Sequence, residues 1–404
     1  MKFRHSLAAS FAVALTAGLA VPVVATPAHA AEDIYTPPAT VTGDPGTVLK
    51  QAPSVYALDV LGLTKAKATV TTIQYVSTGA RGDRTAVTGT VIVPDAPWKK
   101  GGERPIVSVS PGTQGLNDKC APSKLIQTAK LYDGNWIRKF YDAGYAVAVT
   151  DYEGLGTPST HPYGNNVALG HNALDVVRAA QDLGFSRTAP VFLQGFSEGG
   201  GATGGALELA PTYAPELNIR GAHATAPTAD LAVIGKNIES SIYQTFMLFA
   251  VKMLEVTYPE LGIRDLTNEK GSKLLDEADT AYGCLPESLP SGWLDTRTLT
   301  KEGKTISSYL TRPDIAAQLE ELRLGQKRVD VPFRITSSWA DDVVPNSSVK
   351  KAARDWCELG SKISYGTLIA PTHVASGYTG SGQAVGFFND LVAGKAFSSN
   401  CGRI

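Results

Sequence analysis

Alternating and uniformly apolar stretches along the chain predict short strands separated by helices. Two alternating, β-branched stretches at 69–77 and 85–94 flank the turn residues 79–83, a pattern typical of an antiparallel hairpin. Further short runs are apolar at nearly every position, as in strands that are buried on both faces. These runs cover residues 105–110, 146–150, 191–193, 219–226, 331–337 and 363–369.

Helical spacing fills several of the gaps between these strands. Apolar residues recur at helical intervals over 125–143 and 167–183, and a closing helix is expected over 383–392. Strands that alternate with helices, with loops of ligand-binding type at the strand ends, predict a doubly wound, mostly parallel α/β sheet. This rhythm stops between residues 230 and 330, where the sequence is mostly helical. We predict that this segment is a helical cap inserted into the α/β domain.

The first 30 residues have the features of a secretory signal peptide. Lys2 and Arg4 precede an apolar run over residues 7–24, and Ala28-His29-Ala30 fits a small-x-small cleavage site. We expect cleavage after Ala30, which leaves residues 31–404 as the exported domain. No later stretch is apolar over the length needed to cross a bilayer, so we predict a secreted, extracellular protein.

Charge and cysteine content narrow the function classes. The chain carries 37 Lys and Arg against 38 Asp and Glu, and loss of the signal peptide would change the net charge from −1 to −3. Nucleic-acid binding needs a basic footprint that this balance does not supply. The sequence contains no motif for a metal or a cofactor.

All four cysteines lie in the exported part, and no two have the spacing of a zinc site. An even number of cysteines in an oxidising compartment predicts two disulfides. Three pairings are possible. We favour Cys120–Cys284 with Cys357–Cys401, because the second bond would tie the C-terminal tail to a nearby helix.

The most informative stretch runs from Gly195 to Gly199, directly after the strand at 191–193. It reads G-F-S-E-G and fits G-x-S-x-G, the pattern of a nucleophile elbow between a strand and a helix. Such a turn strains the backbone of Ser197, and glycine at both ends removes the clash that a Cβ atom would cause. A glycine-rich loop that contains a serine by chance is the alternative. The strand before the motif and the small-residue helix after it favour the elbow.

A serine nucleophile needs a base and an orienting acid, which follow it in the chain order Ser, acid, His in α/β-hydrolases. Of six histidines, His373 is the one downstream of the later strands, in a loop directly after the strand at 363–369. His223 comes before any candidate acid loop. Asp341 is the preferred acid, since D-x-x-V-P places it where the strand at 331–337 ends, and Asp342 is the alternative.

Backbone N–H groups are expected to bind the oxyanion of a tetrahedral intermediate. One should come from Glu198, directly after the nucleophile. The other should come from the loop at 112–114, from either Thr113 or Gln114. Asp151 and Glu153 also lie at a strand end, where we assign them a supporting role.

The apolar stretch at 242–256 in the cap carries the candidate acyl-binding residues Met247, Phe249 and Met253. A helix this apolar is most simply interpreted as buried against the core. The functional interpretation is that it lines an acyl channel or lifts as a lid, since unbranched Met side chains accept differing acyl chains.

With the elbow, Asp341 and His373, the chain resembles the secretory lipase family. The resemblance covers most of the exported chain and includes Cys120-Ala121-Pro122-Ser123 and Asp151-Tyr152-Glu153-Gly154. It implies an α/β-hydrolase fold with a helical cap and hydrolysis of acylglycerols and other carboxylic esters. The oxyanion loop, residues 111–115, is richer in glycine than expected of the yeast relatives.

These observations together predict a secreted serine carboxylic-ester hydrolase of the triacylglycerol lipase type, acting through a Ser-His-Asp triad and an acyl-enzyme. Its partner would be a lipid or another ester, with transient contact to a lipid surface, and neither nucleic acid nor a cofactor. One alternative is an acyltransferase that passes the acyl group to a sugar or lipid alcohol with the same triad. Another is a non-catalytic binding protein on this scaffold, although such proteins usually lose the serine or the histidine.

Overall fold

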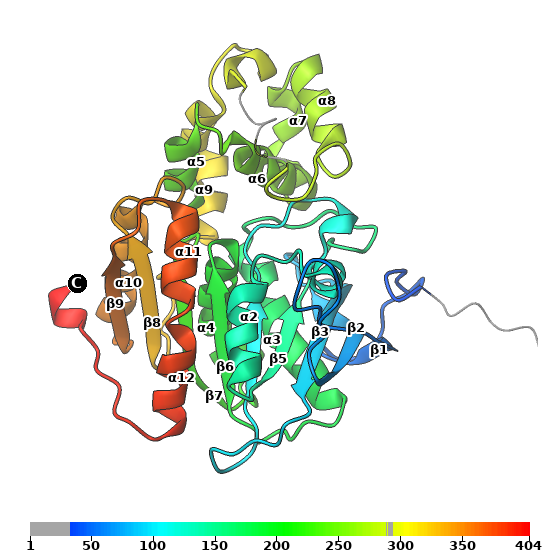
Figure 1. The fold of residues 1–404 in the computed structure, drawn as a ribbon. Coiled ribbons are helices and arrows are strands. Elements are labelled where there is room, and N and C mark those ends of the chain that lie inside the picture. Colours follow the sequence, from blue (N-terminus) through cyan, green and yellow to red (C-terminus); the bar gives the residue numbers. More distant parts are fainter. Residues whose placement is uncertain (1–32, 288, 290–293) are drawn as a thin grey trace, which may run out of the picture. The chain divides into compact units, whose positions relative to one another are not determined.

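A mixed β-sheet organises the unit that runs from Ile34 to Ile404 (Figure 1). The structure is a computed structural model that describes residues 33–287, 289 and 294–404. The predicted signal peptide and its cleavage site therefore lie outside the described residues. Within the described ranges, nine strands form the sheet in the order β1-β2-β3-β5-β4-β6-β7-β8-β9.

The strands at one side of the sheet are antiparallel and the rest are parallel. The β1–β2, β2–β3 and β3–β5 pairs are antiparallel, and every pair from β5 through β4 to β9 is parallel. The hairpin predicted between 69 and 94 corresponds to β2 and β3, whereas β1 was not predicted. The strands are β1 (Val48–Pro53), β2 (Ala68–Thr78), β3 (Arg84–Pro94), β4 (Ile106–Ser110), β5 (Ala146–Thr150), β6 (Val191–Phe196), β7 (Ile219–Thr225), β8 (Phe333–Ser338) and β9 (Ile363–Leu368).

Helices cover both faces of the sheet, which is why β4, β5 and β6 are buried at every position. One face carries α3 (Asn166–Asp182), α4 (Glu198–Tyr213) and α10 (Asn346–Glu358). The other carries α2 (Gly134–Asp142) and α12 (Ala384–Val392), with α11 (His373–Ser381) directly before α12.

The helix predicted over 125–143 is interrupted in the structure. It consists of α1 (Pro122–Leu125), a 3₁₀ turn at Ile126–Thr128 and, after a gap, α2. Ala129 adopts φ 52°, a left-handed conformation that ends the first part. The helical spacing of apolar residues therefore continues across residues 129–133, which are not helical.

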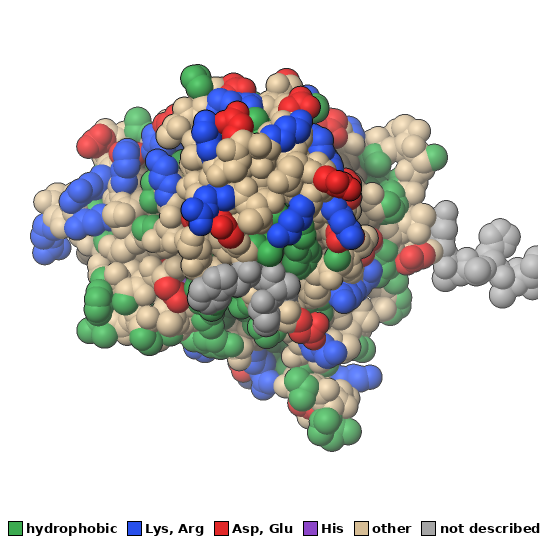
Figure 2. Space-filling model, turned by 90° about the horizontal axis from the view of Figure 1, so that it is seen from above, with side chains coloured by type: hydrophobic (Ala, Val, Ile, Leu, Met, Phe, Trp, Pro, Cys, Tyr) green, Lys and Arg blue, Asp and Glu red, His purple; other side chains and the backbone are tan. Residues whose placement is uncertain are grey.

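Between β7 and β8 the chain leaves the sheet and forms a group of helices. All of them lie within the segment predicted at 230–330, which we call the cap. The helices are α5 (Leu231–Ile238), α6 (Gln244–Thr257), α7 (Ile263–Leu266), α8 (Glu269–Glu277) and α9 (Pro313–Glu321). Figure 1 shows them above the upper edge of the sheet, where the parallel strands end. Seen from above, basic and acidic side chains are interspersed on this surface (Figure 2).

Two disulfides connect distant segments, in the pairing favoured from the sequence. Cys120–Cys284 joins the region after β4 to the cap, and Cys357–Cys401 joins α10 to the C-terminal segment. The described residues contain no free cysteine. Nor does this part of the chain include a helix long and apolar enough to cross a membrane.

Candidate active site

Ser197 lies in the sharp turn between β6 and α4. Its backbone has φ 58° and ψ −119°, a conformation that residues other than glycine rarely adopt. A Cβ atom on Gly195 would lie 1.9 Å from the carbonyl oxygen of Gly199, and one on Gly199 would lie 1.9 Å from that of Ser110. Gly195 is therefore required for the turn itself and Gly199 for its packing against β4, which gives the G-x-S-x-G pattern its physical reason.

An imidazole and a carboxylate that follow two other strands form a chain of contacts that ends at Ser197. His373 Nε2 lies 2.7 Å from Ser197 Oγ, and His373 Nδ1 lies 2.9 Å from each carboxylate oxygen of Asp341. His373 is the first residue of α11 rather than part of a loop, and Thr372 caps that helix. The ring of Phe196 stacks on the imidazole with 4.8 Å between ring centroids.

Asp341 and Asp342 have different partners. The buried carboxylate of Asp341 contacts the imidazole and accepts backbone N–H groups from Val343 (3.1 Å) and Val344 (2.8 Å). Asp342 accepts the backbone N–H of His373 at 2.8 Å and the hydroxyl of Tyr243, in the cap, at 3.0 Å. Burial, with Asp342 beside the hydroxyl, raises the pKa of Tyr243 to about 12.

The loop after β4 lies against the same site. Thr113 lines a cavity together with Ser197, whereas the Gln114 side chain donates to the Gly112 carbonyl oxygen (2.9 Å) and to Asp133 (3.0 Å). Asp133 also accepts the Gly112 N–H at 3.3 Å. Burial raises the pKa of Asp133 well above its ordinary value. The buried carboxyl group of Asp133 thus fixes the loop on the side away from the cavity, and Thr113 is the loop residue that borders the cavity.

Cavities lie on two sides of Ser197. The outer pocket has a volume of about 280 Å³ and opens to solvent. The aromatic residues that line it are Tyr132, Trp136, Phe196, Tyr243, Phe246 and Tyr378. The inner chamber, of about 50 Å³, extends from Ser197 under the cap helices.

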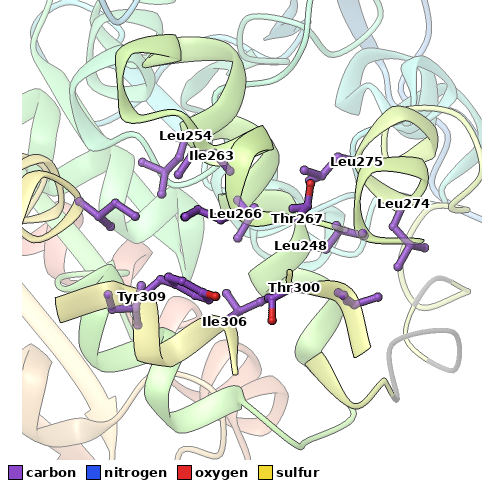
Figure 3. Close-up of a pocket in the computed structure, with 15 residues that line it drawn as sticks. Leu248, Leu254, Ile263, Leu266, Thr267, Leu274, Leu275, Thr300, Ile306 and Tyr309 are labelled. Carbon is purple, nitrogen blue, oxygen red and sulfur yellow. The ribbon is translucent and has the colours of Figure 1, made fainter. Parts of the chain in front are cut away.

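A third cavity, the cap chamber, lies inside the cap and has a volume of about 60 Å³. Figure 3 shows Leu254, Ile263 and Leu266 on one side of it and Ile306 and Tyr309 facing them. The residues that line both the inner chamber and the cap chamber are Val251, Leu254, Ile306 and Leu310. An apolar wall therefore runs without interruption from Ser197 into the cap.

Of the three acyl-binding candidates on α6, Met247 borders the inner chamber. Phe249 and Met253 are fully buried, and neither lines the three cavities. The ring of Phe249 packs against those of Tyr163 and Tyr282. These two candidates are therefore core residues of the cap.

Sequence reasoning missed a buried pair next to the nucleophile. Glu198 was expected to contribute its backbone alone, yet its side chain lies 2.9 Å from His161 Nε2, and both side chains are buried. The one available signal was a charged residue at the start of an otherwise small and apolar helix. Asp151 holds Ser123 and Thr88 by hydrogen bonds, and burial raises its pKa to about 6. Among the described residues, no group of three His, Cys, Asp or Glu side chains could hold a metal ion.

Comparisons with known proteins give the family of the chain. Residues 121–400 match the model of the secretory lipase family. A probable inactive lipase of Mycobacterium tuberculosis is 26% identical over 382 residues, which cover 91% of this chain and 83% of that protein. A secreted triacylglycerol lipase of Malassezia globosa is 27% identical over 308 residues, covering 70% of this chain and 65% of the relative.

Solved structures give the fold. Candida antarctica lipase A in its closed state aligns with a TM-score of 0.79 at 23% identity, over 92% of this chain and 88% of the other. The rice cell wall degrading esterase LipA from Xanthomonas oryzae aligns with a TM-score of 0.72 at 18% identity, over 88% of this chain and all of the other. The predicted α/β-hydrolase fold, with its mostly parallel sheet, is confirmed.

Proposed function

Because the chain belongs to the secretory lipase family, we propose that it is a secreted serine hydrolase of carboxylic esters, of the triacylglycerol lipase type. The observation that carries this proposal is the contact of His373 with both Ser197 and Asp341. A relative at 26% identity is named a probable inactive lipase, so activity is the first property to measure.

The proposed reaction proceeds through an acyl-enzyme. Ser197 Oγ attacks the ester carbonyl carbon while His373 Nε2 takes the hydroxyl proton, and Asp341 holds the Nδ1–H of the imidazolium. When the tetrahedral intermediate collapses, the ester C–O bond breaks and the imidazolium gives its proton to the departing alcohol. A water molecule then repeats both steps and releases the carboxylic acid. The 2.7 Å and 2.9 Å contacts of His373 support these proton transfers.

Backbone N–H groups of Glu198 and Thr113 are the proposed oxyanion donors. Glu198 begins α4, whose first N–H groups lack partners within the helix. Thr113 is favoured over Gln114 because it borders the outer pocket beside Ser197, and the Gln114 side chain is held by Gly112 and Asp133.

We assign the acyl chain to the inner chamber and the alcohol to the outer pocket. The inner chamber and the cap chamber share an apolar wall and are narrow, which suits an alkyl chain. The outer pocket is larger and open, so the leaving alcohol could depart through it.

Export and contact with a lipid surface complete the proposal. Two disulfides and relatives named secreted lipases support an extracellular location, with residue 31 as the expected first residue of the exported chain. Val374 and Tyr378, which line the outer pocket, are about half exposed, and a lipid surface could cover them transiently.

The test is hydrolysis of p-nitrophenyl esters of graded chain length by wild type, Ser197→Ala, His373→Ala and the double variant. Each single variant should lose about 10⁵- to 10⁶-fold in kcat, and the double variant should be hardly worse, because these groups act as a unit. Circular dichroism should show an unchanged fold. Turnover near the wild-type level in either single variant would overturn the proposal, and product analysis with an added alcohol separates hydrolysis from acyl transfer.

A further inference from the structure

A buried acid–imidazole pair lies beside the nucleophile and takes no part in the triad. Glu198 directly follows Ser197, and its Oε1 lies 2.9 Å from His161 Nε2. The exposed fractions of the two side chains are 1% and 0%, so water does not screen the pair. A buried charge without a partner is costly, which makes the proton content of this pair important.

The hydrogen bonds fix how many protons the pair holds. His161 Nδ1 lies 3.0 Å from the carbonyl oxygen of Glu153, and a carbonyl can only accept, so Nδ1 carries a proton. The 2.9 Å contact between Nε2 and Glu198 Oε1 then requires one proton between them. Whether this proton resides on nitrogen or on oxygen, the pair has no net charge. The Gly164 N–H also donates to Oε1, at 3.3 Å.

The pair connects the two segments that carry the proposed oxyanion donors. Glu198 belongs to the turn of the nucleophile, and the ring of His161 stacks on Tyr152 with 5.6 Å between centroids. The Tyr152 hydroxyl donates to the Pro111 carbonyl oxygen at 2.8 Å, in the loop that continues to Thr113. A shift of either partner would therefore be passed to both donors.

We propose that His161 and Glu198 are positioning residues that hold the backbone N–H of Glu198 toward the oxyanion while keeping the Glu198 carboxyl group electrically neutralised. This inference rests on the proposed ester hydrolysis. A carboxylate without its counter-charge so close to a developing oxyanion would oppose the reaction, because charges interact strongly in a buried site. His161 removes that repulsion and leaves the anchoring hydrogen bond in place.

Several other titratable groups surround the pair. They are Tyr132 and Asp133 before α2, Tyr152 and Glu153 after β5, and Tyr163 before α3. Burial raises the pKa values of the three tyrosines, which stay neutral, and raises the pKa of Glu153 to about 7. Burial also raises the pKa of Asp133 well above its usual range. Glu153 and Asp133 therefore need controls in any pH experiment.

The experiment compares kcat/KM of wild type, His161→Gln, Glu198→Gln and the double variant on a soluble short-chain ester from about pH 6 to about pH 9. In His161→Gln the carboxyl group has no counter-charge, so it can be neutral only by carrying a proton, which becomes less favourable as the pH rises. The kcat/KM of His161→Gln relative to wild type should then fall by about tenfold or more as the pH rises. The fall should come from kcat rather than from KM. The double variant and Glu198→Gln, which have no carboxyl group, should show a ratio independent of pH.

The same measurement is repeated with Glu153→Gln and with Asp133→Asn as the parent protein. If the activity of His161→Gln relative to its parent still falls as the pH rises, the pH dependence belongs to Glu198. A pH-independent loss in His161→Gln that simply follows its melting temperature overturns the inference and indicates a structural role. If His161→Gln does not fold, the ¹⁵N shifts of His161 in wild type decide, since the inference requires a proton on Nδ1 and the Nε2–H tautomer contradicts it. Absence of Ser197-dependent hydrolysis in wild type would instead refute the proposed function, and the NMR measurement would still report on the pair.

Discussion

Asp341 and Asp342 are neighbours in sequence whose roles are separated by their hydrogen-bond partners. Asp341 holds His373 Nδ1, whereas Asp342 accepts the backbone N–H at the start of α11. We predict that Asp341→Asn lowers kcat by about 10³- to 10⁴-fold, because an amide no longer stabilises the imidazolium. Asp342→Asn should cost less than about tenfold, since an amide oxygen still accepts the N–H. Steady-state kinetics on one soluble ester tests both variants, and the reverse order would exchange the two assignments.

His223, which the sequence analysis excluded as the catalytic base, makes the stability of the fold depend on pH. It is fully buried on β7, and burial, assisted by Arg334, lowers its pKa to about 3. The unfolded chain therefore binds a proton below about pH 6.5 that the folded chain excludes, and stability falls as the pH drops from there. At about pH 4 this single group should cost about 3 kcal/mol of unfolding free energy.

We predict that His223→Leu removes this part of the acid sensitivity. Near neutral pH its unfolding free energy should lie within about 1 kcal/mol of wild type, because neither ring nitrogen has a hydrogen-bond partner among the described residues. The variant should be more stable than wild type only in acid. Urea unfolding at about pH 4 and at neutral pH measures the difference in unfolding free energy. An equal difference at both pH values would show that packing rather than protonation is responsible.

At the scale of elements, α6 offers two methionines with different surroundings. Met247 lines the inner chamber, and Met253 is buried within the cap away from the cavities. Truncating either to Ala should cost about 2–5 kcal/mol in stability. Only Met247→Ala should also enlarge the chamber and raise the relative rate with branched or bulky acyl groups.

The matched control is Met253→Ala, which removes the same atoms from the same helix. Melting temperatures should fall in both variants, whereas the ratio of branched-chain to linear-chain rates should change only in Met247→Ala. An unchanged ratio in Met247→Ala would contradict the assignment of the acyl chain to the inner chamber and would indicate that α6 is a core helix.

Which elements the sequence predicts depends on whether local or tertiary forces create them. The elbow was predictable because its glycines have fixed places around Ser197 in the motif, although only the clash at Gly195, with Gly199, is local, and the clash at Gly199 is with Ser110 on β4. The helical start of α11 at His373 was missed, although its Thr372 cap is a local signal. The His161–Glu198 pair was missed for another reason: its partners are 37 residues apart and meet only after folding.

At the scale of the molecule, exposed apolar side chains follow the ends of β8 and β9, the strands that precede Asp341 and His373. Ser338 and Leu368 are paired in β8 and β9, so the next residues, Trp339 and Ile369, lie side by side, with exposed fractions of 70% and 94%. We predict that replacing both with Ser lowers activity on an emulsified triacylglycerol several-fold. Hydrolysis of a dissolved short-chain ester should be unchanged, because neither residue lines the cavities at Ser197.

Leu61 and Leu63 provide the control for this surface. They are exposed to a similar extent but lie between β1 and β2, at the opposite end of the sheet from β8 and β9. Their replacement by Ser should leave both activities unchanged. Equal losses in the two double variants would indicate a general effect of surface hydrophobicity rather than a lipid-facing region.

The layout of the whole chain was predictable where composition changes along the sequence. The end of the strand–helix rhythm near residue 230 and its return near 331 delimited the cap, since a parallel sheet requires that rhythm. The cavities could not be predicted, because they form where side chains from separate helices leave gaps between them, and these gaps depend on the tertiary packing. Val251 and Leu310, which border both chambers, have no feature that distinguishes them from other apolar residues.

The bond between Cys120 and Cys284 determines how the cap can move. The cap is already continuous with the sheet through β7 and β8, and this third covalent attachment lies beside the loop that carries Thr113. Next to it, the Leu285 N–H donates to the Gln114 carbonyl oxygen at 2.9 Å. A segment tethered at three points cannot swing open as a rigid flap, so admission of substrate requires bending within the cap or displacement at the side far from Cys284. Reduction of this disulfide would leave the hydrogen bond between Leu285 and Gln114 as the link between the cap and the loop that carries Thr113, so we expect the rate of hydrolysis to depend on the redox state of the surroundings.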